Sequence, residues 1–134
     1  MKAVFADTAF FVALINSRDQ YHERAVELNA VLECPLLTTA WILLELANAL
    51  SASRFRPRFE RVLHGLRTVP NVEIIPANSA LFERGCKLYI DRSDKEWSLT
   101  DCISFEVMQE RDLADALTAD HHFAQAGFRP LLTV

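Results

Sequence analysis

Four acidic residues stand where predicted strands and helices meet loops, and together they suit one kind of chemistry. Asp7 follows a short apolar strand, Glu45 lies within an apolar helix, Asp101 opens a later helix, and Asp120 follows a late strand. Carboxylates are costly to bury, and mutual repulsion makes a cluster of them costlier still. A fold that draws four of them together therefore needs a compensating cation, and a divalent metal ion that serves phosphate chemistry is the usual one.

Hydrolysis of a phosphodiester needs an activated water and stabilisation of the charge that builds up on the phosphate and on the leaving oxygen. One or two Mg²⁺ or Mn²⁺ ions held by carboxylates meet these needs if some coordination positions stay open. Other catalytic arrangements are absent from the sequence, which has no evident Ser-His-Asp set, no phosphate-binding glycine loop and no Cys/His spacing suited to zinc.

The elements that must position these acids alternate along the chain as strand and helix. Apolar runs and breaking prolines predict strands at Val4–Ala6, Leu36–Thr39, Val72–Ile75, 116–118 and 130–134, and helices at 10–15, 21–33, 41–54, 57–68, 79–91 and 101–111. This alternation predicts an α/β protein: a three-layer α/β/α sandwich with a central, mainly parallel sheet of four to five strands. Without an internal repeat or a flexible linker, we expect one domain over residues 1–134.

In such sheets, ligands bind beyond the carboxyl ends of the strands, where the strand order reverses. Asp7 and Asp120 lie at the carboxyl ends of the first and fourth strands, and Asp101 lies at a helix N-terminus facing the same rim. Glu45 lies about one turn into the helix after the second strand, so its side chain can reach back to that rim. The four placements converge on one crevice.

Composition narrows the setting of this domain. A 51% hydrophobic and 24% charged chain is globular, and a net charge of −4 provides no bulk basic field for nucleic acid, although acids of a metal site count as negative until the ion binds. The three cysteines are scattered, which favours a reducing compartment. Asp7 interrupts the N-terminal apolar run and other apolar runs are too short to span a bilayer, so we expect a soluble cytoplasmic protein without a signal peptide or membrane partner.

The four acidic segments also resemble a known family. The chain is similar to small PIN-domain ribonucleases of the type found as VapC toxins in bacterial and archaeal toxin–antitoxin pairs. The resemblance rests on the ordered segments VFADT at 4–8, LELANAL at 44–50, LTDCISF at 99–105 and LTADHHF at 117–123. Each segment alone is weak, but their order, their spacing and the chain length agree, so the resemblance covers essentially the whole chain.

The resemblance implies endonucleolytic cleavage of single-stranded or structured RNA that depends on Mg²⁺ or Mn²⁺. It implies direct metal ligation by Asp7 and Asp101, while Glu45 and Asp120 would complete the pocket through a second metal or by positioning water. Hydrogen bonds from two threonines, Thr8 and Thr118, would support these acids. The family also implies a homodimer and a small antitoxin protein that occludes the crevice.

Other functions fit parts of the pattern. A PIN-type nuclease of RNA maturation or DNA processing would carry the same acids, and a non-catalytic interaction domain would carry them for structure. A receiver-like phosphotransfer module is disfavoured because it needs paired acids after the first strand and a late lysine, and no lysine follows Lys95. The RNA that is cut, the number of metal ions and the oligomeric state are not determined by the sequence.

Each acid also has a structural interpretation. Asp7, Asp101 and Asp120 could cap the helices that they precede or open. Glu45 is the hardest to explain in this way, because an unpaired charge is rare in a helix that is apolar almost all round. Asp115, at the far end of its strand, is interpreted as structural. The adjacent pair His121 and His122 is expected at an exposed helix start, since neighbouring helical residues point in different directions.

An arginine-rich stretch between residues 54 and 67 is the candidate RNA-binding surface. Arg54, Arg58 and Arg61 recur at helical spacing and can form a basic stripe close to the helix of Glu45. The alternative is a solvated face paired with acids such as Glu60. The phenylalanines of this stretch are expected in the core, and four other residues are candidates for a protein interface that the pattern cannot separate from core: Tyr21, Phe82, Leu88 and Tyr89.

Overall fold

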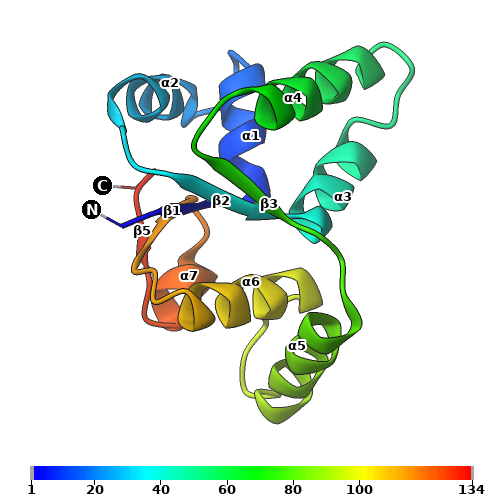
Figure 1. Cartoon of the computed structure of the whole chain (residues 1–134), viewed down its shortest axis with the longest axis vertical. Coiled ribbons are helices and arrows are strands. Elements are labelled where there is room, and N and C mark those ends of the chain that lie inside the picture. Colours follow the sequence, from blue (N-terminus) through cyan, green and yellow to red (C-terminus); the bar gives the residue numbers. More distant parts are fainter. Residues whose placement is uncertain (1, 134) are drawn as a thin grey trace.

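The computed structural model describes residues 2–133 and has a five-stranded parallel sheet at its centre (Figure 1). The strands stand in the order β3-β2-β1-β4-β5, and every neighbouring pair is parallel. Their bounds are β1 Val4–Ala6, β2 Leu36–Thr39, β3 Val72–Ile75, β4 Asp115–Leu117 and β5 Arg129–Pro130. The central strand β1 is fully buried, as its continuous apolar sequence predicts.

Within residues 2–133, seven helices cover the two faces of this sheet. One face carries α1 Thr8–Ile15, α2 His22–Val31, α3 Ala40–Ala49 and α4 Arg56–Thr68, and the other carries α5 Ser79–Asp91, α6 Leu99–Glu110 and α7 His121–Gln125 (Figure 1). Right-handed crossovers explain this division, because the connections from β1 to β3 step one way across the sheet and the later ones step the other way. The predicted three-layer α/β/α sandwich is confirmed.

The reversal of strand order lies between β1 and β4, whose residues pair as Phe5 with Ala116 and Ala6 with Leu117. A crevice opens at the carboxyl ends of two such strands, because their helices leave toward opposite faces. Asp7 follows β1 directly, and its backbone amide donates to the Leu117 carbonyl at 3.2 Å. The sheet topology therefore places Asp7 where the strand order reverses, which is called the switch point of the sheet.

On the second face, α5 and α6 pack closely around Gly85. A Cβ atom added at Gly85 would stand only 2.4 Å from Cγ1 of Ile103, so glycine is what allows this approach. The contact fixes α6, whose N-terminal end carries Asp101.

Two predicted elements end several residues earlier in the structure than the sequence predicts, and the other predicted elements differ from their predicted bounds by at most two residues. The fifth strand, predicted at 130–134, is Arg129–Pro130. The chain turns after it, where the Thr133 hydroxyl donates to the Pro130 carbonyl, and residue 134 lies outside the described residues. The helix predicted at 41–54 ends at Ala49, since the Ser51 hydroxyl bonds the Asn48 carbonyl at 2.7 Å and closes the helix. No helix among residues 2–133 is long and apolar enough to cross a membrane.

Candidate metal-binding active site

Asp7 is buried at the switch point without a capping role. It occupies the N-cap position of α1, but its side chain makes no capping hydrogen bond. Instead its Oδ2 accepts a hydrogen bond of 2.8 Å from the Thr118 hydroxyl. Burial raises the pKa of Asp7 to about 7, the Thr118 bond opposes the rise, and the negative charges of Asp101 and Glu45 add to it. The side chain therefore carries an electrostatic cost that helix capping does not explain.

Asp101 is held at the start of α6 by a reciprocal capping box. The Asp101 amide donates to Oγ of the N-cap residue Ser98 at 3.0 Å, and the Ser98 amide donates to Asp101 Oδ2 at 3.1 Å. This arrangement satisfies two free amides of the helix end and fixes the carboxylate. Asp101 is 9% exposed, so its orientation is set by backbone groups rather than by solvent.

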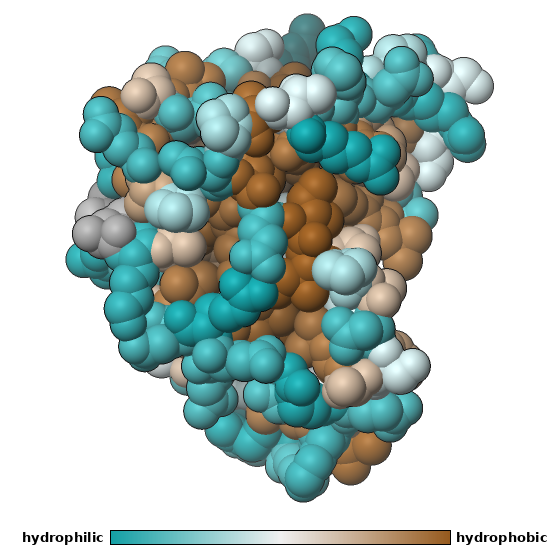
Figure 2. Space-filling view, in the orientation of Figure 1, coloured by the Kyte–Doolittle hydropathy of each residue, from teal (hydrophilic) through white to brown (hydrophobic). Residues whose placement is uncertain are grey.

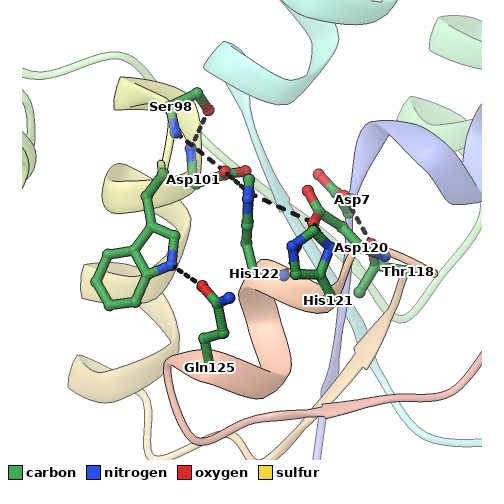
Figure 3. A network of polar contacts seen from close by, with 9 residues as sticks. Asp7, Ser98, Asp101, Thr118, Asp120, His121, His122 and Gln125 are labelled. Atoms are coloured by element: carbon green, nitrogen blue, oxygen red, sulfur yellow. Dashed lines mark hydrogen bonds and ion pairs between the residues drawn. The ribbon is translucent and has the colours of Figure 1, made fainter. Parts of the chain in front are cut away.

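Asp120 does cap a helix, as its structural interpretation predicts. Its Oδ1 accepts a 2.9 Å hydrogen bond from the His122 amide at the start of α7. The Asp120 amide donates to Thr118 Oγ1 at 3.0 Å, and the same hydroxyl donates to Asp7. Thr118 therefore joins the first and fourth acids, as Figure 3 shows. It is fully buried, which makes this link rigid.

His122 lies inside the acidic network, so the expectation of two exposed histidines is wrong for this residue. Its side chain is 20% exposed, whereas that of His121 is 76% exposed. Nδ1 of His122 lies 3.0 Å from Asp101 Oδ2 and 3.4 Å from Asp120 Oδ1, between the two acids (Figure 3). The sequence contains one indication of this placement of His122: it follows Asp120 by two residues and so lies in the first turn of the helix that Asp120 caps, α7, which packs against α6.

Glu45 differs from the sequence interpretation in its burial. It is exposed, because α3, although apolar in sequence almost all round, is not buried all round: Ile42 and Leu46 are buried, while Leu44 is 58% exposed. The argument from the cost of a buried charge therefore does not apply to Glu45. Its Oε1 accepts a 2.5 Å hydrogen bond from the Thr8 hydroxyl, and its charge raises the pKa of Asp7, so it does belong to the group.

Aromatic rings in the core connect the elements that carry Asp7, Asp101 and Asp120. Phe5 lies two residues before Asp7, and its ring centroid is 6.3 Å from that of Phe123, which follows Asp120 by three residues. The ring of Phe105, one turn after Asp101, is 5.0 Å from Phe123 in an edge-to-face contact. These contacts tie β1, α6 and α7 together in the core. The acids at the ends of these elements are thereby held in fixed relative positions.

The donor set of this network suits a hard divalent cation. Within residues 2–133, no lysine or arginine lies within 4.0 Å of a carboxylate oxygen of Asp7, Asp101, Glu45 or Asp120. Carboxylate oxygens are the ligands that Mg²⁺ and Mn²⁺ prefer, and a nearby dication would reverse the electrostatic cost at Asp7. Asp120, His121 and His122 also place ligand atoms within 4.8 Å of one another at the edge of the network.

The arginine-rich stretch forms an exposed corner beyond α3. Arg54 lies before α4 and Arg58 lies in its first turn, and their guanidinium carbons stand 4.5 and 4.9 Å from the centre of the Phe55 ring. Arg61 is exposed further along α4 and, within residues 2–133, makes no cation–π contact. Phe59 packs against the core, as expected. Phe55 does not belong to the core cluster, so the expectation for that residue is wrong.

Comparison with known proteins gives consistent relatives. A model of the PIN-domain family matches residues 4–129. The chain is 30% identical over 126 residues to the 23S rRNA-specific endonuclease VapC20 of Mycobacterium tuberculosis, covering 93% of this chain and 95% of that protein. The crystal structure of M. tuberculosis VapC20, described as a Sarcin-Ricin loop cleaving toxin, superposes with a TM-score of 0.83 at 26% identity and covers 93% of this chain and 95% of that one.

Two further solved structures share the fold at lower identity. VapBC2 from Rickettsia felis, bound to a DNA fragment from its promoter, gives a TM-score of 0.66 at 14% identity and covers 96% of each chain. FitAcB from Neisseria gonorrhoeae gives 0.64 at 17% identity, covering 95% of this chain and 94% of that one. At these identities the likeness concerns the fold alone.

Proposed function

The chain belongs to the PIN-domain family, and on that premise we propose that it is a metal-dependent endoribonuclease, the toxin component of a type II toxin–antitoxin pair. The observation that carries the proposal is the burial of Asp7 beside two other acids without a lysine or arginine partner, which raises its pKa to about 7. A protein that only needed structural acids would pair them, because unpaired buried charge lowers stability. The relative VapC20, 30% identical and named as an endonuclease, supports the same activity.

In this proposal the carboxylates of Asp7 and Asp101 hold Mg²⁺ or Mn²⁺, with Glu45 and Asp120 completing the pocket. When bound, such an ion lowers the pKa of a coordinated water and neutralises charge at the scissile phosphate. The protein's own groups keep the acids in place: the Thr118 hydroxyl orients Asp7, and the Ser98 amide and the His122 ring orient Asp101. Such outer partners fix the direction of ligand oxygens before substrate arrives.

The substrate class follows from the relatives rather than from the site. VapC20 is named for 23S rRNA and its structure is described as cleaving the Sarcin-Ricin loop, so a structured RNA loop is the first substrate to try. A PIN-type nuclease in RNA maturation or DNA processing is the alternative within the same family. A cytoplasmic location, which a toxin acting on ribosomal RNA requires, is part of the proposal.

The proposal also includes two protein partners, a small antitoxin and a second copy of the chain. The four candidate interface residues fall into two groups in the structure. Tyr21 and Leu88 pack against the core. Phe82 and Tyr89 of α5 are 40% and 51% exposed, and the neighbouring Ile90 is 71% exposed. Exposed apolar groups of this size on one helix favour a protein contact. Sedimentation of the purified chain alone and with a co-expressed antitoxin would test both.

The test is cleavage of purified ribosomal RNA by the isolated chain with Mg²⁺ or Mn²⁺ and with EDTA. Cleavage should stop in EDTA and return with excess metal, and Asp7→Asn or Asp101→Asn should lower the rate at least about 100-fold, since each removes a charged ligand. Asp115→Asn provides the matched control, because this acid is equally buried and lies at the other end of the sheet. Full activity in EDTA, or in a folded Asp7→Asn variant, would refute the proposal.

A further inference from the structure

The arginines between residues 54 and 67 differ from the chain's other cations in having no acidic partner. Of the nine lysines and arginines outside this stretch, seven form ion pairs with aspartate or glutamate. None of the five arginines inside it does so among residues 2–133, although Glu60 lies within the same helix. The solvated, acid-paired face that Glu60 would have provided is therefore absent, and the positive charge is free to meet a partner.

Two of these arginines are organised by one aromatic ring. The guanidinium carbons of Arg54 and Arg58 lie 4.5 and 4.9 Å from the centre of the Phe55 ring, within the range of a cation–π contact. Phe55 is half-buried yet packs outside the core cluster, so the core does not account for its ring.

The backbone beneath the ring is also fixed. Nε of Arg56 donates to the Ser51 carbonyl at 2.8 Å, and the amides of Phe55 and Arg56 both bond the Ala52 carbonyl. Arg56 is therefore used to shape the connection between α3 and α4, while Arg54 and Arg58 are not. The corner presents two guanidinium groups at fixed positions, which lowers the ordering cost of binding.

The position of this corner relates it to the acidic site. Glu45 and Ala49 lie on the same helix, α3, and Ala49 ends it about 6 Å further along the axis at 1.5 Å per residue. The connection that carries Arg54 follows at once, at the outer end of α3 (Figure 1). A strand that passes the acids and continues along α3 would reach the two arginines next.

We propose that Arg54, Phe55 and Arg58 form an RNA-docking platform, in which the two guanidinium groups bind phosphates of a single-stranded RNA segment beside the cleavage site and Phe55 holds them in place. The inference rests on the proposed endoribonuclease function and adds the residues that grip the substrate. Guanidinium groups match phosphate geometry and stack on bases, and the position of the corner beyond the helix of Glu45 favours RNA over an acidic protein surface. Phe55 acts through the arginines and is a positioning residue.

The experiment measures binding of a fluorescein-labelled stem-loop RNA with a single-stranded loop by anisotropy, in the Asp7→Asn background so that the RNA stays intact. The variants are a double variant that combines Arg54→Ala and Arg58→Ala, the single variant Phe55→Leu, and the conservative single variant Phe55→Tyr. Arg67→Ala is the matched control, because Arg67 is an exposed arginine without an ion pair in the last turn of the same helix. It removes one positive charge away from the ring, half of the charge that the double variant removes.

The double arginine variant should lower affinity at least about tenfold and reduce the steepness of log K against log salt by about 1.4, or about 0.7 for each phosphate contact. Phe55→Leu should cost about fivefold and Phe55→Tyr should restore affinity, while Arg67→Ala changes it by less than about twofold. In the Asp7-containing enzyme the double variant should raise KM and leave kcat within about twofold.

The inference is overturned if Arg67→Ala weakens binding as much as the platform variants, since net charge alone would then explain it. It is also overturned if platform variants bind RNA normally and instead lose affinity for a co-expressed acidic protein. Failure of the proposed function would appear elsewhere, as absence of metal-dependent RNA cleavage by the unaltered chain. The two failures are therefore distinguishable.

Discussion

Buried acids at the two ends of the sheet differ in the partners that the protein gives them. At the amino end, Asp115 is 8% exposed and accepts two hydrogen bonds from Arg129, at 2.8 and 3.0 Å. At the carboxyl end, Asp7 and Asp101 are 7% and 9% exposed and have no lysine or arginine partner within the described chain. Equal burial with unequal pairing separates an acid held by an arginine from acids that we propose hold a metal ion.

The contrast also holds for the cations. Arg129, Arg111 and Arg84 pair with acids on neighbouring elements and so link those elements. Among residues 2–133, Arg54 and Arg58 form no ion pair and instead make cation–π contacts with the Phe55 ring. The acids without cations lie at the rim from which α3 starts, and the cations without acids lie beyond the other end of α3. A polyanion bound with a divalent ion would satisfy both.

The largest effect is expected for the stability of the metal-free protein. Folding raises the pKa of Asp7 to about 7 from an unfolded value near 3.9, so between these values the folded state binds a proton that the unfolded state has lost. Stability should therefore fall as pH rises from about 4 to 7 and then level off. Asp7→Asn removes this loss and should stabilise the protein in EDTA at pH 8, by at most about 4 kcal/mol.

Urea unfolding of both proteins in EDTA at pH 5 and pH 8 would measure this difference. The gain from Asp7→Asn should be about a third as large at pH 5 as at pH 8. A variant that is less stable than the parent at pH 8 would mean that the Thr118 contact outweighs burial of the charge, and the comparison between the two ends would fail.

A smaller effect of opposite sign is expected for Asp115→Asn. This change weakens a bidentate, charge-assisted contact in which the arginine remains partly exposed, so it should lower the free energy of unfolding by about 2 kcal/mol. RNA cleavage, measured at a temperature where circular dichroism shows a folded protein, should stay within about twofold. Loss of cleavage in that folded variant would give Asp115 a role that its pairing does not indicate.

The smallest of these effects is expected for His122→Ala. Its ring lies between Asp101 and Asp120, and loss of such an outer partner weakens the orientation of a ligand carboxylate. We expect kcat/KM for RNA to fall about tenfold. His121→Ala is the control, because that ring is 76% exposed, and it should change kcat/KM by less than about twofold. Equal losses of kcat/KM in both variants would mean that removing any histidine here has this effect, and that the position of the His122 ring between the two acids is not its cause.

Much of the fold was predictable because its signals are local. The run before Asp7 is apolar without alternation, which indicates a strand covered on both faces, and the regular succession of helices then requires a parallel sheet. Strand ends and helix starts fix where Asp7, Asp101 and Asp120 lie, so their convergence could be predicted as well. The proposed catalytic roles of these acids stay predictions.

Features that depend on tertiary packing could not be predicted. The exposure of Glu45 depends on which face of α3 meets the sheet, and that face is set by contacts from α1 and β2. His122 turns inward because α7 packs beside α6. This packing could not be predicted, because a helix of five residues is too short to show a periodic pattern in the sequence. Phe55 looks like a core residue by type, and only the early end of α3 at Ala49 places it at an exposed corner.

Calorimetric titration of Mn²⁺ into the metal-free protein, its Asp7→Asn and Asp101→Asn variants and Asp115→Asn tests the central claim most directly. The unaltered chain and Asp115→Asn should bind Mn²⁺ with the same affinity. The Asp7→Asn and Asp101→Asn variants should each bind Mn²⁺ at least about tenfold more weakly, since each loses a charged oxygen ligand. Equal Mn²⁺ binding by all four proteins, or no binding to the unaltered chain at millimolar Mn²⁺, would contradict the claim that the unpaired acids hold a divalent cation.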